Sequence, residues 1–268
     1  MITLPTTWFV GCGHMAGALI EGWQKAGVDF DAAVVIRPSG RQVEGMRTLT
    51  AIPDEPPPLR CVLGFKPQML GAIAPGLAPK LSSETVLVSM LAGVEAETLR
   101  ARFPGVGSVV RIMPNLPAAE RRGVTALFSH DADPELRQRM QGLFGLLGLA
   151  VWTDSEPDLA SIGSVAGAGP AYVARFIAAL AKAGEARGLN PALAARIALE
   201  TVLGTALMAE AGGESMAEVA RRVASPKGTT EAGLAVLDHD HALDELIAKT
   251  IAAAARRGAE LAEEARKP

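Results

Sequence analysis

The sequence is poor in aromatic residues and carries little net charge. Phe, Trp and Tyr together make up 4% of the 268 residues, whereas hydrophobic residues make up 49%. This balance favours helices and parallel strands built from Ala, Leu and Val over an aromatic-rich β-sandwich. The formal net charge is -3, and no basic stripe is interleaved with aromatic residues, so we expect no nucleic-acid partner.

Cysteine is also scarce, with Cys12 and Cys61 as the two thiols of the chain. Two thiols do not make a disulfide framework and suit a reducing compartment, so a cytoplasmic location is expected. The N-terminus lacks both a basic region and a continuous apolar run, so no signal peptide is predicted. The most apolar stretch, residues 165–181, contains glycines, a proline and an arginine. It predicts a buried helix and the segment leading to it, and no membrane span.

A glycine-rich motif follows the first apolar run. Residues 8–10 are typical of a buried strand, and residues 11–16, Gly-Cys-Gly-His-Met-Ala, lead into a helical pattern. This is the G-x-G-x-x-A fingerprint of dinucleotide binding, although a plain glycine-rich strand–helix turn has the same residues. The helix start offers free N–H groups to phosphates and would lower the pKa of a thiol there. We predict cofactor contacts from Gly11, Cys12, Gly13, His14, Met15 and Ala16.

Residues up to about 153 alternate short apolar runs with helical stretches. Near-continuous β-branched runs joined by helices predict a parallel sheet that is covered on both faces. We therefore expect an α/β domain over residues 1–153. Its candidate strands are residues 8–10, 32–36, 61–65, 85–89 and 108–112, with further candidates at 124–128 and 149–152.

Strand patterns end at about residue 154, and the segment 154–268 predicts a separate all-helical domain. Glycines and prolines bound its helices. The apolar faces are wide, so either an ordinary intrachain core or, as we expect, a shared dimer interface covers them. The predicted helices are residues 171–187, 191–211, 215–223, 230–237 and 242–265.

The turn after the second predicted strand distinguishes the two nicotinamide dinucleotides. An NAD site places Asp or Glu at the end of this strand, but residues 36–41 are Ile-Arg-Pro-Ser-Gly-Arg. Arg37 and Arg41, with the hydroxyl of Ser39, suit a 2′-phosphate. NADPH is therefore favoured, NADH stays possible, and solvated surface arginines are the alternative interpretation.

Further candidate residues follow the next three predicted strands. Lys66 and Pro67 follow the third strand, Ala92 and Gly93 the fourth, and Asn115 the fifth. The carboxyl ends of parallel strands share one edge, where open α/β sheets bind ligands. We predict cofactor contacts from all five residues. Lys66 can also approach a substrate carboxylate, or it is simply an exposed lysine in a loop.

A turn rich in Pro, Gly and hydroxyl groups precedes a helix in the C-terminal half. Residues 224–234 are Ala-Ser-Pro-Lys-Gly-Thr-Thr-Glu-Ala-Gly-Leu. Thr229 or Thr230 can cap the helix, and Glu231 suits its first turn. Bare N–H groups at a helix start suit a carboxylate, whereas a helix–helix turn with an N-cap explains the same residues.

Segments in order along nearly the whole chain resemble the pyrroline-5-carboxylate reductase family. The last of them looks like the family's most specific signature. The resemblance implies an N-terminal Rossmann domain and a C-terminal all-helical dimerisation domain, in a homodimer or a higher oligomer built from dimers. It implies reduction of L-1-pyrroline-5-carboxylate to L-proline, the last step of proline biosynthesis, by NAD(P)H. The matching segments are residues 9–16, 66–68, 109–115, 167–172 and 225–234.

The resemblance also implies that the signature turn binds the substrate carboxylate and that the dimer completes each active site. Backbone N–H groups of Gly228, Thr229 and Thr230 would hold the carboxylate, and the Thr230 hydroxyl would bond the ring nitrogen, directly or through water. Ser225 and Glu156 complete the predicted substrate contacts, with a solvated acid at a helix start as the alternative for Glu156. A protonated cyclic imine is already electrophilic, so positioning suffices, with no metal and no covalent nucleophile.

The sequence departs from the family pattern at Lys227, where glycine is common, at Leu116, where threonine is common, and at Leu91. These departures leave the fine substrate preference open. One alternative is an NADP-dependent reductase of another cyclic imine or of a β-hydroxy acid, in which Lys182 would be the catalytic residue. The other is a cofactor-binding regulatory protein without catalysis, against which the hydroxyls of residues 229 and 230 argue.

Overall fold

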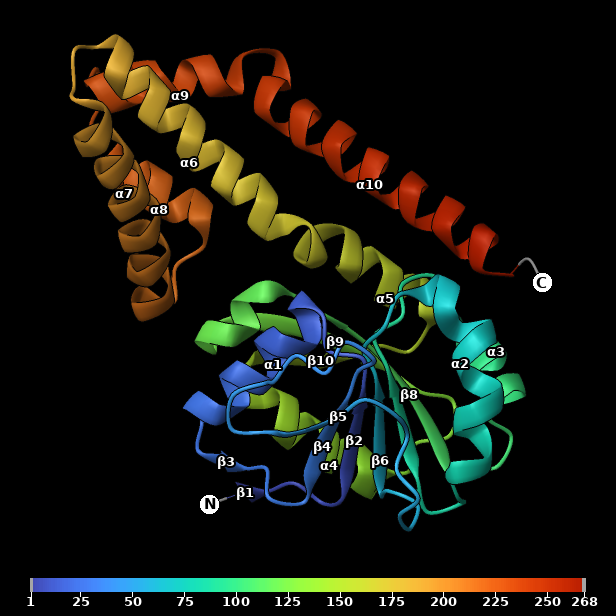
Figure 1. Ribbon diagram of the computed structural model, residues 1–268. Helices are drawn as coiled ribbons and strands as arrows, with labels where there is room; N and C mark the ends of the chain where they lie inside the picture. The colour runs from blue at the N-terminus through green and yellow to red at the C-terminus, as the bar shows by residue number, and fades with distance from the viewer. Residues whose placement is uncertain (1, 267–268) are drawn as a thin grey trace. The chain divides into compact units, whose positions relative to one another are not determined.

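An eight-stranded sheet surrounded by helices occupies the N-terminal part of the chain in the computed structural model, which describes residues 2–266 (Figure 1). Neighbouring strands are parallel except for β8 and β9, which pair antiparallel. The predicted mostly parallel sheet is confirmed. Its strands are β2 (Thr7–Val10), β4 (Ala33–Ile36), β5 (Arg47–Leu49), β6 (Arg60–Leu63), β7 (Val86–Ser89), β8 (Ser108–Pro114), β9 (Gly123–Phe128) and β10 (Gly148–Trp152).

The order of the strands creates a switch point in the middle of the sheet. Across the sheet the order is β10-β9-β8-β7-β6-β2-β4-β5. The chain therefore moves from β2 outward through β4 and β5, then crosses back to β6 on the other side of β2. Ligands of open α/β sheets bind at the carboxyl ends of the strands at such a point. Val10 lies opposite Leu63, so the loops after β2 and β6 leave the sheet side by side there.

Alternate residues along each strand enter two different hydrophobic cores, one on each face of the sheet. Phe9 belongs to the core that α1 and α4 cover. Trp8, its neighbour, belongs to the core that α2 and α3 cover. Helices on both faces explain why the strands are apolar throughout. The four helices are α1 (His14–Lys25), α2 (Leu70–Leu77), α3 (Ala96–Arg102) and α4 (Pro134–Gly145).

Several short elements are absent from the sequence-based prediction because two to five residues carry no measurable period. Two of them, β1 and β3, pair in a small parallel sheet of their own. The others are β5 at the edge of the main sheet and short 3₁₀ helices in the loops. The bounds are β1 (Ile2–Thr3), β3 (Val28–Asp29), η1 (Pro67–Met69), η2 (Ala78–Lys80), η3 (Leu116–Glu120) and η5 (His239–His241).

After β10 the described chain, up to residue 266, is helical, which confirms the predicted helical C-terminal region. Helix starts coincide with capping side chains: the Asn190 side chain accepts hydrogen bonds before α7, and Ser215 with Glu218 forms a capping box at α8. The elements are α5 (Glu156–Ile162), the π-helical turn η4 (Gly163–Gly167), α6 (Gly169–Ala186), α7 (Pro191–Gly212), α8 (Met216–Val223), α9 (Thr229–Asp238) and α10 (Ala242–Arg266).

The chain forms two compact units. The first unit comprises the chain up to Ala168 together with the segment from Ala254 onward. The second unit is Gly169–Ala253. The first unit includes α5, which packs on β8 and β9. The domain boundary expected between residues 153 and 154 stays a prediction.

Helices α6 and α7 expose much of their apolar surface in the single chain. The sequence predicts that this segment is a buried helix, but Ala181 is the one residue of α6 that is buried. That expectation is therefore wrong for one chain. The segments Glu156–Ala186 and Pro191–Gly212 are long and apolar enough to cross a membrane by length and composition, and their apolar windows are 6% and 17% buried. An exposed apolar surface of this extent is typical of a site that another molecule shields from water. Exposed large side chains include Val173, Phe176, Leu180, Leu193, Ile197, Leu199, Leu203 and Leu207.

Candidate functional site

The loop between β2 and α1 adopts a conformation that only glycine tolerates at its first position. Gly11 has a φ of 83°, and a Cβ there would lie 2.8 Å from the backbone nitrogen of Phe65. The Gly11 N–H donates to the Ile36 carbonyl at 2.8 Å, and Gly64 N–H donates to the Val10 carbonyl at 2.9 Å. The loop therefore passes directly over the end of β6, and a side chain at position 11 would push it away.

The start of α1 is open toward any ligand above it. Gly13 is the N-cap residue, and no side chain caps the helix. A Cβ at Gly13 would meet no atom within 4 Å, so the space beside the backbone is free. Ala16, in the first turn of α1, is buried. If Gly64 carried a Cβ, that atom would lie 3.1 Å from the Cβ of Ala16, so the helix packs closely on the end of β6. Free N–H groups beside open space fit a pyrophosphate.

The Cys12 thiol faces a different environment from the one expected at a helix start. Burial raises the pKa of Cys12, and the nearby charge of Arg37 lowers it by a smaller amount. The expected lowering of the pKa by the helix start is therefore wrong, and the thiol stays protonated at neutral pH. The contribution from Arg37 also shows that the turn after β4 lies close to the glycine loop.

The turn after β4 arranges Arg37 and Ser39 side by side. Arg37 N–H donates to the Leu49 carbonyl at 2.8 Å, which ties the turn to β5. Arg37 Nε donates to Ser39 Oγ at 3.1 Å, and the Arg41 N–H donates to the same oxygen at 3.4 Å. Arg41 is exposed and Arg37 is half-buried. A hydroxyl and a guanidinium next to the glycine loop fit a phosphate on the ribose.

The loops after β6 and β7 leave the same edge of the sheet, because Leu63 pairs with Ser89 at the ends of these parallel strands. Lys66 is exposed and has an extended backbone conformation, and Pro67 begins the short helix η1. Ala92 is exposed and Gly93 has a φ of 75°. These residues therefore border the edge at which the glycine loop lies. His14 and Met15, at the start of α1, are exposed and half-buried respectively.

The Asn115 side chain uses both ends of its amide within the protein. Its Nδ2 donates to the Ala166 carbonyl of η4 at 3.0 Å, and its Oδ1 accepts from the Val124 N–H at 2.8 Å. The residue is buried at the end of β8. Asn115 thus joins β8, β9 and the π-helical turn, and a cofactor contact from this side chain stays a prediction.

A buried ion pair ties Glu156 into the sheet. Arg111 Nη1 lies 2.7 Å from Glu156 Oε1, and the side chains are 8% and 22% exposed. The same oxygen accepts a hydrogen bond from the Ala96 N–H at 2.8 Å. One carboxylate oxygen therefore connects β8, the first residue of α3 and the first turn of α5, and the predicted substrate contact of Glu156 would have to use the other oxygen.

Arg111 and Ala96 are the contact partners of Glu156, and the sequence alone predicts neither of them. A signal for Arg111 exists, since it interrupts the apolar run of residues 109–112 in a buried strand. A guanidinium in such a strand requires a carboxylate partner. The identity of that partner, 45 residues further along the chain, depends on the tertiary fold.

In the second unit, residues 225–228 form a tight turn before α9. Gly228 N–H donates to the Ser225 carbonyl at 2.9 Å. Pro226 and Lys227 occupy the central positions, and Lys227 has a φ of 60°, the pattern of a type II turn in which glycine is preferred. A Cβ at Gly228 would collide with Ser225 Oγ. Lys227 therefore adopts the left-handed conformation that glycine favours, at the position where a glycine is expected from the sequence.

The start of α9 has backbone donors without a capping side chain. Gly228 is the N-cap and makes no side-chain cap hydrogen bond. Glu231, in the first turn, reaches back to accept from the Lys227 N–H at 2.6 Å, and the Gly228 N–H donates within the turn, so the N–H groups of Thr229 and Thr230 are the ones left for a ligand. Thr229 is exposed and Thr230 is half-buried. The tip can bind a carboxylate, with the Thr230 hydroxyl close by.

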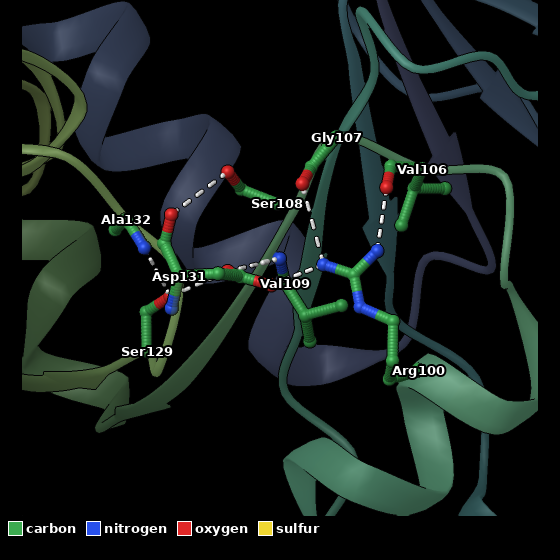
Figure 2. Close-up of polar contacts among 8 residues, drawn as sticks. All are labelled: Arg100, Val106, Gly107, Ser108, Val109, Ser129, Asp131 and Ala132. Atoms are coloured by element: carbon green, nitrogen blue, oxygen red, sulfur yellow. Dashed lines mark hydrogen bonds and ion pairs between the residues drawn. The ribbon is translucent and has the colours of Figure 1, made fainter.

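A pocket of about 320 Å3 lies at the opposite edge of the sheet, at the amino end of β8. Figure 2 shows the polar contacts beside it: Arg100 donates to the carbonyls of Val106 and Gly107 and pairs with Asp131. Asp131 Oδ1 accepts from the Val109 N–H at 3.0 Å. These groups satisfy one another, so they act as a structural clamp. Within residues 2–266, no three His, Cys, Asp or Glu side chains gather as metal ligands.

Comparisons with known proteins identify relatives along the whole chain. Residues 156–261 match the family model described as pyrroline-5-carboxylate reductase dimerisation. The chain is 34% identical to the pyrroline-5-carboxylate reductase of Pseudomonas aeruginosa, covering 98% of this chain and 99% of that protein. It is 32% identical to the Pisum sativum enzyme of the same name, covering 96% of each.

Solved structures agree with these sequence relatives. A pyrroline-5-carboxylate reductase from Coxiella burnetii superposes with a TM-score of 0.84 at 27% identity, covering 98% of this chain and 99% of that one. The Plasmodium falciparum pyrroline carboxylate reductase, solved with NADP bound, has the same fold, with a TM-score of 0.84 at 22% identity over 98% of this chain and 100% of that one.

Proposed function

Because the chain belongs to the pyrroline-5-carboxylate reductase family, we propose that it reduces L-1-pyrroline-5-carboxylate to L-proline with NADPH. The observation that carries the proposal is the presence of two uncapped helix starts, one after the glycine loop at Gly13 and one after the turn at Gly228. Each offers backbone N–H groups to an anion. One suits the pyrophosphate of a dinucleotide, and the other suits the carboxylate of the substrate.

The cofactor half of the proposal uses residues of the first unit. NADPH supplies a hydride when it is bound. The glycine loop would hold the pyrophosphate, because Gly11 lets the loop pass close over the end of β6 and Gly13 leaves open space beside the backbone. Arg37, Arg41 and Ser39 would hold the 2′-phosphate, and Lys66, Pro67, Ala92, Gly93 and Asn115 would border the nicotinamide end at the same edge.

The substrate half uses the tip of α9. The N–H groups of Thr229 and Thr230 would orient the carboxylate. The Gly228 N–H, predicted to share this role, already donates to the Ser225 carbonyl at 2.9 Å and holds the turn. The Thr230 hydroxyl would bond the ring nitrogen and keep a proton there, so that the carbon of the C=N bond accepts the hydride and the nitrogen ends as an amine. Positioning of this kind supplies most of the rate for a protonated imine. Glu156 stays a predicted substrate contact through its second oxygen, because the first is engaged by Arg111 and Ala96.

We propose a homodimer, or a larger assembly of dimers, in which a second copy covers the apolar faces of α6 and α7. The match to a dimerisation family over residues 156–261 supports this. So do charged residues along these helices, such as Arg175, Lys182 and Arg196, which disfavour a lipid environment. Cys12 and Cys61 are both free thiols, which supports the proposed cytoplasmic location.

Steady-state kinetics test the proposal directly. We expect turnover of pyrroline-5-carboxylate with NADPH, a lower kcat/KM with NADH, and no turnover of 3-hydroxy acids with NADP+. Turnover of a 3-hydroxy acid would favour the reductase class that uses Lys182. Stoichiometric NADPH binding without turnover of any cyclic imine would favour the regulatory alternative.

Replacing Arg37 with Ala should raise the KM for NADPH by about tenfold or more, since a charge-assisted bond to the 2′-phosphate is lost. The KM for NADH should hardly change, because that cofactor lacks the phosphate. Arg47→Ala is the matched control, since Arg47 pairs with Glu55 at 2.6 Å outside the turn. An equal effect of Arg37→Ala on both cofactors would show that Arg37 does not recognise the phosphate.

A further inference from the structure

The turn after β7 (residues 91–94) is held firmly on its inner side. The Val94 N–H donates to the Leu91 carbonyl at 3.3 Å, and the Leu91 N–H donates to Ser89 Oγ at 3.3 Å. Leu91 and Val94 are buried in the core that α2 and α3 cover. Gly93 has a φ of 75°, the value expected at the third residue of a type II turn. The two ends of the turn are thus anchored in the core, and Gly93 lies at its outer tip.

The carboxyl end of α10 lies directly against this tip. A Cβ at Gly93 would lie 2.8 Å from Ala262 Cα, 2.9 Å from Ala262 N and 3.0 Å from the carbonyl carbon of Leu261. A side chain does not fit at such distances, so the backbone of the turn and the backbone of the helix are in direct contact. Small residues on both sides, glycine in the turn and alanine on the helix, permit this approach.

The burial pattern of α10 agrees with the contact. Leu261 and Ala262 are half-buried, whereas Glu260 and Glu263 on either side of them are exposed. The chain from Ala254 onward belongs to the same compact unit as the turn after β7. The contact therefore lies inside the first unit, the one that carries the glycine loop.

The contact bears on the cofactor edge of the sheet. The loops after β6 and β7 leave that edge together, and Ala92, which is exposed beside Gly93, is proposed to border the nicotinamide. The core fixes the turn from one side, and α10 fixes it from the other. A misplacement of roughly 1 Å in a group that positions a reactant can cost about a hundredfold in rate. An element that holds this turn therefore affects how well the cofactor is bound.

We propose that Ala262 and the adjoining turns of α10 hold the turn after β7 in place for the nicotinamide end of NADPH. Ala262 is a positioning residue, because it acts on the cofactor through Gly93 and Ala92. The inference rests on the proposed function, since it gives α10 a role in the same cofactor site. It makes the end of α10 part of the support of that site, in addition to the dimerisation proposed for the helical region.

A leucine placed at either of two adjacent positions tests the contact. Ala262→Leu adds bulk where the helix meets Gly93, whereas Glu263→Leu adds the same side chain at an exposed position. Without cofactor, the amides of residues 89–95 should exchange with deuterium about fivefold faster in Ala262→Leu than in wild type. The KM for NADPH should rise about fivefold, and the KM for pyrroline-5-carboxylate by less than about twofold. Glu263→Leu should match wild type in all three measurements.

A matched pair of glycines separates the contact from backbone strain. Gly27 has a φ of 74°, close to that of Gly93, and a Cβ there would meet no atom of the described chain within 4 Å. Gly93→Ala should lower the Tm more than Gly27→Ala, since both strain the backbone but only the former forces a Cβ into α10. In a chain that ends at Gly258 and so lacks the end of α10, the two substitutions should lower the Tm equally.

Unchanged exchange of residues 89–95 and an unchanged KM for NADPH, in Ala262→Leu and in the chain that ends at Gly258, would overturn the proposal. Equal changes in Ala262→Leu and Glu263→Leu would overturn it too, as would an equal rise in both KM values. If Ala262→Leu does not fold, the shortened chain tests the contact. A wild-type protein that neither binds NADPH nor reduces the imine would refute the proposed function instead, and the exchange rates without cofactor would still show whether α10 holds the turn.

Discussion

Replacing Glu156 with Ala is expected to lower the free energy of unfolding by about 3–5 kcal/mol. The reason is the environment of Arg111, whose side chain is 8% exposed and whose guanidinium pairs with Glu156 at 2.7 Å. Removing the carboxylate leaves a buried charge unpaired and also leaves the Ala96 N–H without its acceptor. Urea unfolding followed by circular dichroism, at one fixed protein concentration, measures the change.

Two further variants identify the cause of that loss. Arg111→Met combined with Glu156→Leu removes both charges, so the double variant should recover most of the lost stability. Glu21→Ala is the control, because Glu21 pairs with Lys25 on an exposed helix face, and its loss should cost less than about 1 kcal/mol. An unchanged urea midpoint for Glu156→Ala, with a raised KM for the substrate, would instead make Glu156 a substrate ligand.

Replacing Thr230 with Ala should lower kcat for pyrroline-5-carboxylate reduction by about a hundredfold, the usual effect of removing one side-chain group that holds a proton on the reacting group. The hydroxyl is proposed to bond the ring nitrogen, whereas the residues proposed to bind NADPH belong to the other unit. The KM for NADPH should therefore change by less than about threefold. Steady-state kinetics with both substrates varied measure the two effects separately.

The neighbouring threonine offers a matched control. Thr229 is exposed at the same helix tip and contributes only its backbone N–H in the proposal, so Thr229→Ala should retain most of kcat. Thr230→Ser keeps a hydroxyl and should recover much of the activity that Thr230→Ala loses. Equal losses of kcat and NADPH affinity in Thr230→Ala would contradict the assigned role.

Local signals predict the sheet and the glycine loop well, because both depend on neighbouring residues. The runs at residues 8–10, 32–36 and 61–65 match β2, β4 and β6 within two residues at either end. Gly11 is predicted to permit a tight turn. Its φ of 83° and its close approach to the backbone of Phe65 are the physical reasons why glycine is needed there. The edge strand β5 escapes prediction because three residues at the margin of a sheet carry no periodic pattern.

Partners far apart in the sequence cannot be predicted from one sequence. Glu156 is predicted as a substrate-side carboxylate because its position matches a family, but its contact with Arg111 depends on how α5 returns to β8. A charged residue inside an apolar strand indicates that a partner is needed and does not identify it.

Apolar periodicity also leaves open which chain covers a helix. The pattern of residues 165–181 predicts burial, yet within one chain α6 buries Ala181 alone. The pattern reports that a face is apolar, and a second copy can cover it as well as an intrachain core. Lys227 is a milder case: the sequence shows a departure from glycine, and the φ of 60° shows that the backbone keeps the glycine conformation at some cost in strain.

Transfer of deuterium tests the central claim most directly. The protein would be given pyrroline-5-carboxylate and NADPH that carries deuterium at the transferable position of nicotinamide C4, and the proline formed would be analysed by NMR. The account predicts one deuterium at the δ-carbon of proline, the carbon that was double-bonded to nitrogen. Absence of proline, or proline without deuterium at that carbon, would contradict it.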